Sequence, residues 1–191
     1  MLIDTKFRRE VVVAGERVEL RCITGADKEA LNRFFHGLCA DTRYKRFMGY
    51  LGELSEPMLR YLTEVDLDEH TAIVAIGESG AIIGVTRMVR MNKRERAEMA
   101  IVVADAHQGR GLGGMLVRTL AEAAYERGVT TFVAHALSDN VGIRRSLAHV
   151  GALTSDRNDA IVVALRAPAT TELRLGRDGS ARSLPPPSLP H

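Results

Sequence analysis

The spacing of apolar residues along the chain changes between two periods. Residues 18–23 alternate apolar and polar side chains, which predicts a half-buried strand. In residues 27–38 the apolar side chains recur every three or four positions, which predicts an amphipathic helix. Residues 41–50 are expected to be a second helical segment. A third begins at Ser55, a favoured N-cap residue, with Pro57 inside its first turn.

A second group of elements follows, in which strands dominate. Residues 71–76 and 81–89 are predicted strands, separated by the hairpin signal Gly77-Glu78-Ser79-Gly80. Residues 97–104 are almost continuously apolar, which is typical of a strand in the middle of a sheet. The remaining expected elements are a helix that Gly128 ends, a strand at 129–137, a helix at 141–149 and short strands at 152–154 and 160–165.

This order of elements predicts the α/β class. Antiparallel hairpins come first and one strand–helix–strand crossover follows, so we expect a central mixed, mostly antiparallel sheet flanked by helices. Residues 1–166 are expected to form a single domain, which suits a chain of 191 residues. Residues 167–191 are rich in proline, glycine and serine, which predicts a mobile tail with a short extended piece at 171–175.

Composition and charge narrow the possible partners. A formal net charge of +2 is too small to indicate nucleic acid or an anionic membrane as the main partner. The sequence has no apolar run of membrane-spanning length and no secretory signal at its start, which predicts a cytoplasmic protein. Cys22 and Cys39 are expected to be reduced structural thiols. The histidines lack metal-site spacing, so no metal is expected.

A glycine-rich turn lies between the buried strand and the helix that follows it. The turn is Gln108-Gly109-Arg110-Gly111-Leu112-Gly113-Gly114. Its glycines allow left-handed backbone and the close approach of a ligand. The helix presents free N–H groups and the positive end of its dipole to the same space, so a pyrophosphate is the natural occupant. A turn that binds nothing is the structural alternative.

Two other phosphate sites fit this turn less well. Gly109, Gly111 and Gly114 match the G-x-G-x-x-G pattern of dinucleotide-binding folds, but those folds need more strand–helix units than the chain has after Asp139. A nucleoside-triphosphate loop ends in glycine, lysine and serine or threonine, whereas Met115 follows the last glycine here.

The pattern Gln108-x-x-Gly111-x-Gly113, after a strand and before an amphipathic helix, resembles the acyl-CoA signature of the GCN5-related N-acetyltransferase (GNAT) family. The resemblance covers about residues 18–166. It implies the GNAT-like acyl-CoA N-acyltransferase fold and acetyl-CoA as the acyl donor. The contacts that it implies are Ile101, Val102 and Val103 on the pantetheine arm, Gln108, Gly109, Arg110, Gly111, Leu112, Gly113 and Gly114 on the pyrophosphate, and Asn140 on the cofactor arm.

The resemblance also departs from the family at one position. The family often has a tyrosine seven residues after the asparagine, where it protonates the departing thiolate. This chain has Leu147 there, so solvent or another group would supply that proton. A backbone N–H near Val102 would stabilise the negative charge on the thioester oxygen during attack.

Acetyl transfer needs a neutral amine, whereas an alkylamine is protonated at neutral pH, so a general base must remove a proton. Glu98 is the residue expected to be that base. Residues 41–47 and 96–100 are similar to the acetyltransferase domain of bacterial protein-lysine acetyltransferases, in which the second segment carries a catalytic glutamate. Apolar strand neighbours would raise the pKa of the Glu98 carboxyl. The alternatives are that Glu98 faces solvent or pairs with an arginine.

The expected function is therefore direct acetyl transfer to a primary amine, with a protein lysine as the favoured acceptor. A small amine is the second candidate, and a non-catalytic acyl-CoA sensor is the third. The resembling proteins usually carry an extra regulatory or synthetase-like domain, for which 191 residues leave no room; homodimerisation is left open. Basic residues cluster near a predicted hairpin tip, namely Arg87, Arg90, Lys93, Arg94 and Arg96. They are interpreted either as a solvated turn or as an electrostatic guide for an acidic partner.

Overall fold

The computed structural model describes residues 4, 6–137, 140–155 and 160–167. Its elements in chain order are β1 (Arg8–Val13), β2 (Glu16–Cys22), α1 (Lys28–Gly37), α2 (Ala40–Phe47), α3 (Glu56–Thr63), β3 (His70–Ile76), β4 (Ile82–Arg90), β5 (Arg96–Val103), α4 (Leu112–Glu126), β6 (Thr131–Ala134), α5 (Val141–Ala148), β7 (Gly151–Ser155) and β8 (Ile161–Leu165). Short 3-10 turns at Gly25–Asp27 and Asp105–His107 precede α1 and the glycine turn. The predicted tail lies outside the described residues.

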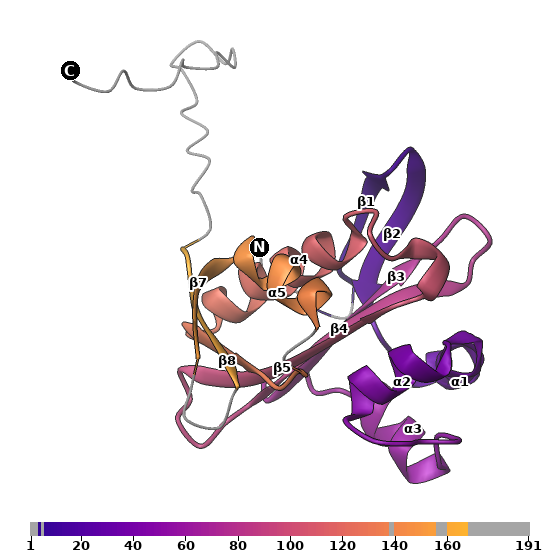
Figure 1. Cartoon of the computed structure of the whole chain (residues 1–191), viewed down its shortest axis with the longest axis horizontal. Helices are drawn as coiled ribbons and strands as arrows, with labels where there is room; N and C mark the ends of the chain where they lie inside the picture. Colours follow the sequence, from indigo (N-terminus) through magenta and orange to yellow (C-terminus); the bar gives the residue numbers. More distant parts are fainter. Residues whose placement is uncertain (1–3, 5, 138–139, 156–159, 168–191) are drawn as a thin grey trace.

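Eight strands form one sheet in the order β1-β2-β3-β4-β5-β6-β8-β7. Every neighbouring pair is antiparallel except β5 and β6, which α4 joins as a crossover connection. Figure 1 shows α4 and α5 on one side of β4 and β5, and α1, α2 and α3 on the other. The expected mixed, mostly antiparallel sheet flanked by helices is confirmed.

Two elements differ from the sequence prediction. β1 was not expected; it pairs with β2 across a turn in which Ala14 and Gly15 both have positive φ. β6 is shorter than the predicted strand 129–137, because residues 135–137 leave the sheet after Ala134. That early exit creates the opening described below.

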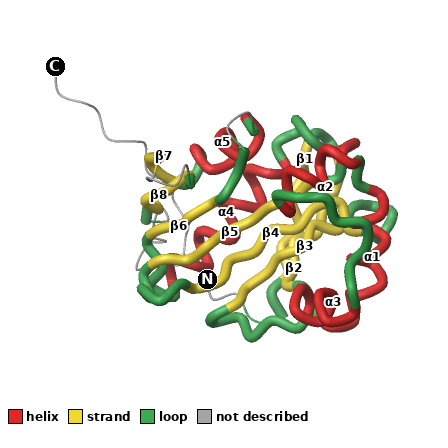
Figure 2. Tube along the Cα trace, turned by 60° about the horizontal axis from the view of Figure 1, so that its bottom comes forward, coloured by secondary structure: helices red, strands yellow, loops and turns green. Residues whose placement is uncertain are grey.

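Each face of the sheet has its own hydrophobic core. On one face Leu116 and Leu120 of α4 are fully buried against the strands, together with Met99 of β5. On the other, Phe35 of α1 and Leu62 of α3 pack in a second cluster. The strands β2 to β5 lie side by side in Figure 2, with α1 and α3 beside them.

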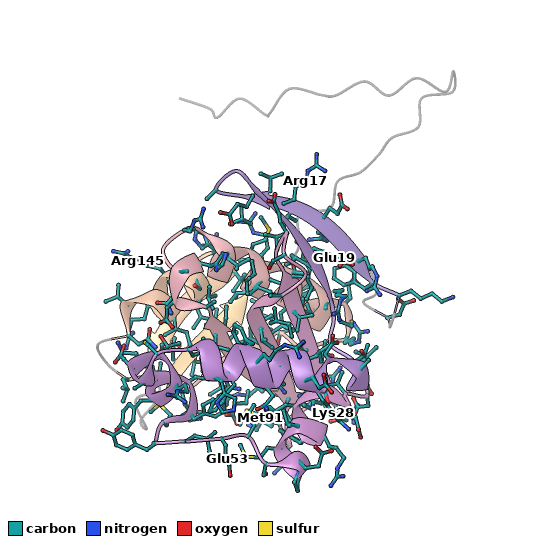
Figure 3. The ribbon with its side chains drawn as sticks, turned by 90° about the vertical axis from the view of Figure 1, so that its right-hand side faces the viewer. Arg17, Glu19, Lys28, Glu53, Met91 and Arg145 are labelled. Atoms are coloured by element: carbon teal, nitrogen blue, oxygen red, sulfur yellow. The ribbon has the colours of Figure 1, made fainter. Side chains whose placement is uncertain are left out.

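Polar contacts fix the helices of the second face to one another. Lys28 of α1 forms an ion pair with Glu64 at the end of α3, with a Nζ–Oε1 distance of 2.6 Å, and its position between the two helices is visible in Figure 3. The helix α2 completes this face and lies against β5. Both cysteines are free thiols, Cys22 in the core and Cys39 exposed. Among the described residues no helix is both long and apolar enough to cross a membrane.

Candidate active site

A cleft begins where β5 and β6 separate. The two strands pair only over Arg96–Glu98 and residues 131–133, although β5 continues to Val103. On its other side β5 pairs with β4 from Ala97 to Val103. Within the described residues, the edge of β5 that faces β6 therefore has no strand partner from residue 99 onward, and its backbone N–H groups lack a strand acceptor.

One hydrogen bond defines which backbone groups face this opening. The N–H of Ala104 donates to the carbonyl of Ile83 in β4 at 2.9 Å. Successive residues of a strand point their N–H groups to opposite sides, so the N–H of Val102 points to β4. The N–H groups of Ile101 and Val103 point into the opening instead. The N–H group that was expected near Val102 to stabilise the thioester oxygen would therefore be that of Ile101 or Val103.

The opening widens into a cleft of about 570 Å³, which lies within the size range of small-molecule sites. The end of β5, the glycine turn, the start of α5 and one face of α2 surround it. The structure brings most of the expected cofactor residues together around this cleft, namely Ile101, Val102, Val103, Gln108, Gly109, Gly111, Gly113, Gly114 and Asn140.

The glycines of the turn have two different structural roles. Gly109 and Gly111 have φ values of +72° and +93°, which L side chains rarely adopt. A Cβ at Gly113 would lie 2.8 Å from Oγ of Ser146, and one at Gly114 would lie 2.9 Å from a ring carbon of His149. The first pair shapes the turn, and the second lets α5 approach α4. Gly111, Gly113 and Gly114 line the cleft, so the first turn of α4, whose N–H groups have no intrahelical partner, lies at its wall.

Gln108 fixes the turn to its neighbours. Its Nε2 donates to the carbonyl of Val103 and to Oγ1 of Thr42 in α2, both at 3.1 Å. Thr42 in turn donates to Asp105 at 2.6 Å, and the N–H of Cys39 donates to the same carboxylate at 2.8 Å. Burial raises the pKa of Asp105, but these hydrogen bonds outweigh that effect and hold it below its ordinary value. The network joins α2, β5 and the glycine turn.

Asn140 begins α5 at the far wall of the cleft. Its Oδ1 accepts a hydrogen bond from the N–H of Ile143 at 3.2 Å, so it is the N-cap of that helix. Leu147, at the position of the family tyrosine, is fully buried in the core between α4 and α5. This position therefore belongs to the core rather than to the cleft.

Two of the expected cofactor residues point their side chains elsewhere. Arg110 forms an ion pair with Glu16 of β2, with an Nη2–Oε1 distance of 2.8 Å. The side chain of Leu112 is 1% exposed and packs in the core beneath the turn. Neither residue lines the cleft, so the structure does not bring these two together with the other expected cofactor residues.

Glu98 lies outside the cleft lining, on the face of the sheet that carries α1, α2 and α3. It opposes Val89 in β4 and Val133 in β6. Its side chain is exposed, which agrees with the solvent-facing alternative that the sequence left open. Burial lowers the pKa of the Arg46 guanidinium in α2, and the charge of the nearby Glu98 carboxylate opposes part of that effect.

Sequence reasoning assigned no role to the α2 wall of the cleft. Asp41, Thr42, Lys45 and Arg46 all line it. Their spacing of three and four residues places them on one face of a helix, which is a signal that the sequence contained. The opposite wall carries Ser146 and His149 of α5, with His135 just past the end of β6.

A sheet opened between two parallel strands, with a glycine-rich turn at the start of the crossover helix, defines the class of the domain. Residues 34–151 match the acetyltransferase (GNAT) family. The chain belongs to this family, so the family that the sequence predicted is confirmed.

Named relatives agree with this assignment. The chain is 33% identical to acetyltransferase Pat of Mycolicibacterium smegmatis over 144 residues, which are 74% of this chain and 43% of that protein. It is 32% identical to an acetyltransferase of Pseudomonas aeruginosa over 117 residues, 60% of this chain and 63% of that protein. The chain thus spans less than two thirds of either relative.

Solved structures give the same result. The GNAT domain of S. lividans PAT superposes with a TM-score of 0.75 at 26% identity, covering 82% of this chain and 94% of that one. The aminoglycoside acetyltransferase AAC(6')-Ib in complex with coenzyme A shares the fold, with a TM-score of 0.56 at 17% identity over 77% of this chain and 94% of that one.

Proposed function

We propose that this domain transfers the acetyl group of acetyl-CoA directly to a primary amine, with a protein lysine as the favoured acceptor. The observation that carries the proposal is the separation of β5 from β6, which opens a cleft of about 570 Å³ between an unpaired strand edge and the glycine turn. Similarity to acetyltransferase Pat supports the family chemistry. The lysine acceptor follows from the resemblance of residues 41–47 and 96–100 to protein-lysine acetyltransferases.

The cleft fits an extended anionic donor. Its pyrophosphate would lie over Gly109, Gly111 and the first N–H groups of α4, and its pantetheine arm would follow Ile101 and Val103. His107 also lines the cleft, and its buried Nδ1 has no hydrogen-bond partner among the described residues. Such an atom suits a polar ligand at this end of the cleft.

The acceptor would approach from the face of the sheet that carries Glu98. The amine loses a proton to the Glu98 carboxylate, directly or through one water. Its nitrogen then attacks the thioester carbon and the carbon–sulfur bond breaks. The new amide nitrogen loses its remaining extra proton to solvent, and the thiolate takes a proton from solvent. The N–H groups of Ile101 and Val103 would stabilise the charge that develops on the thioester oxygen.

An acceptor screen tests the transfer itself. The chain is mixed with acetyl-CoA and with lysine peptides or small amines, while free thiol and acetylated product are measured. We expect thiol release that depends on a lysine peptide. Release with small amines alone would make those the acceptors. If the chain binds coenzyme A tightly but no amine leads to free thiol, that result would contradict catalysis and support an acyl-CoA sensor.

A substitution of Glu98 tests the base. Glu98→Gln keeps the shape of the side chain and removes its basicity, so kcat should fall by about 10²-fold or more while the KM for acetyl-CoA stays unchanged. Glu95→Gln, an exposed glutamate in the turn before β5, is the matched control. Equal activity of the two variants would exclude Glu98 as the base.

A further inference from the structure

Arg87 of β4 is a buried cation whose described hydrogen-bond partners are uncharged. It is 6% exposed, and it lies in the strand interior rather than at the solvated hairpin tip suggested by the sequence. Its Nη1 is 3.1 Å from Nε2 of His70, and its Nη2 donates to the carbonyl of Leu62 at 3.1 Å. Burial lowers the pKa of His70 to about 4, so this imidazole is neutral at physiological pH.

A second guanidinium approaches the same place from α2. Arg46 is half-buried, with its guanidinium 4.8 Å from the centre of the Phe47 ring. Arg46 and Arg87 line one recess of about 30 Å³, which is otherwise formed by apolar side chains on the face of the sheet that carries α1, α2 and α3. Burial, and then the charge of Arg46, lower the pKa of Arg87 to about 9.

The charges in this recess are not balanced by the described residues. No carboxylate among them forms an ion pair with Arg46 or Arg87. Glu98 is near Arg46 but is exposed and makes no such contact. Elsewhere the chain does pair a partly buried guanidinium, since Arg21 forms two hydrogen bonds with Asp27 at 2.8 and 2.7 Å. Because a buried charge without a counter-ion is unfavourable, the recess is suited to an anion from outside the domain.

The recess adjoins the donor cleft on the acceptor side. Arg46 and Val102 line both spaces. On β5, Glu98 and Ala100 face the same side, and Ala100 is the register partner of Arg87. A molecule whose amine reaches Glu98 can therefore place a second group a few ångströms away at the two arginines. A space of 30 Å³ suffices for a carboxylate, since a single water needs about 10–15 Å³.

We propose that Arg46 and Arg87 bind a carboxylate of the acceptor, close to the amine that is acetylated. This inference rests on the proposed acetyl transfer. The carboxylate is either an acidic side chain beside the acceptor lysine or the carboxylate of a small amine. Guanidinium groups bind carboxylates through charge-assisted hydrogen bonds, which are stronger and more directional than neutral ones.

Anion binding can be measured without any activity. Sodium propionate is titrated against sodium chloride at constant ionic strength, and the melting temperature of the full chain is followed. Propionate should stabilise the wild type by a few degrees and should not stabilise Arg46→Gln. Arg33→Gln, on the exposed surface of α1 with 73% of the side chain exposed, is the control and should behave as the wild type does. An equal effect in all three proteins, or none in any, would overturn the anion site.

Activity then tests whether the anion belongs to the acceptor. Acetylation is compared for a peptide with glutamate or glutamine next to its lysine, and for free lysine or lysinamide. The wild type should prefer the acidic member of one pair by about 10- to 100-fold in kcat/KM, and Arg46→Gln should lose that preference. The pair that responds identifies the source of the carboxylate.

The two hypotheses fail in different ways. If no amine is acetylated but propionate still stabilises the chain through Arg46, the proposed transfer is wrong and the anion site stands. If amines are acetylated with no preference for an acidic neighbour, the assignment of the recess to the acceptor is wrong, whatever propionate does.

Discussion

Gly111 begins α4 with a φ of +93°, and replacing it with alanine tests the role of the turn. A built Cβ at this position meets no atom within 4 Å, so the change introduces backbone strain without a steric clash. A left-handed conformation costs an L residue about 1–2 kcal/mol. For a domain of this size that predicts a fall in melting temperature of about 2–8 °C.

Gly128 provides a matched control at the other end of the same helix. Its φ is +80°, and a Cβ there also meets nothing within 4 Å. Gly128→Ala should therefore lose a similar amount of stability. The difference lies in the ligand, because the Cβ of Gly111→Ala projects near the proposed pyrophosphate and strain would turn nearby N–H groups away.

Steady-state kinetics separate the two variants. Gly111→Ala should raise the KM for acetyl-CoA by about 10-fold or more, as expected for the loss of one hydrogen bond to a charged group. Gly128→Ala should leave that KM unchanged at a temperature where both variants are folded. The reasoning fails if both KM values rise together, or if Gly111→Ala binds acetyl-CoA as the wild type does.

Three further predictions concern stability. Burial lowers the pKa of His70 from 6.5 to about 4, so as the pH falls the unfolded state takes up the proton before the folded state does. The free energy of unfolding should therefore fall by about 3 kcal/mol between pH 7 and pH 4. Urea titrations at both pH values should show that His70→Gln lacks this contribution. Gly151→Ala should destabilise strongly, because its Cβ would overlap the backbone of Ala164, and a melting temperature near that of the wild type would contradict this. Leu147→Tyr should lower stability by about 1–3 kcal/mol through overpacking and should not increase kcat.

Much of the fold could be predicted because most elements have strong periodic patterns. β1 was missed because it lies at the edge of the sheet, and none of its residues in Arg8–Val13 is fully buried. Its position depends on pairing with β2, which no local pattern specifies. The length of β6 was overestimated for a related reason, since after Ala134 His135 lines the cleft and Ala136 packs against the core without pairing in the sheet.

The two walls of the site differ in how far the sequence predicts them. The glycine turn is contiguous, so its glycines, its helix start and Gln108 could be identified together. The wall formed by α2 depends on contacts between distant residues, such as Thr42 with Asp105, which are 63 positions apart. Arg87 was grouped with the basic residues of the hairpin tip, although it lies in the predicted strand 81–89, because the sequence could not show that α3 covers that strand.

The separation of β5 from β6 leaves the interior of the sheet with a gap that no strand of the described chain fills. The N–H and C=O groups of Ile101 and Val103 border it. A donor whose amide-bearing arm lies along this edge would act as a substitute strand and join the two halves of the sheet. Ligand binding would then be a structural event as well as a chemical one. Amide hydrogen exchange at Ile101 and Val103 should slow when coenzyme A binds, together with exchange in β6 on the far side of the gap.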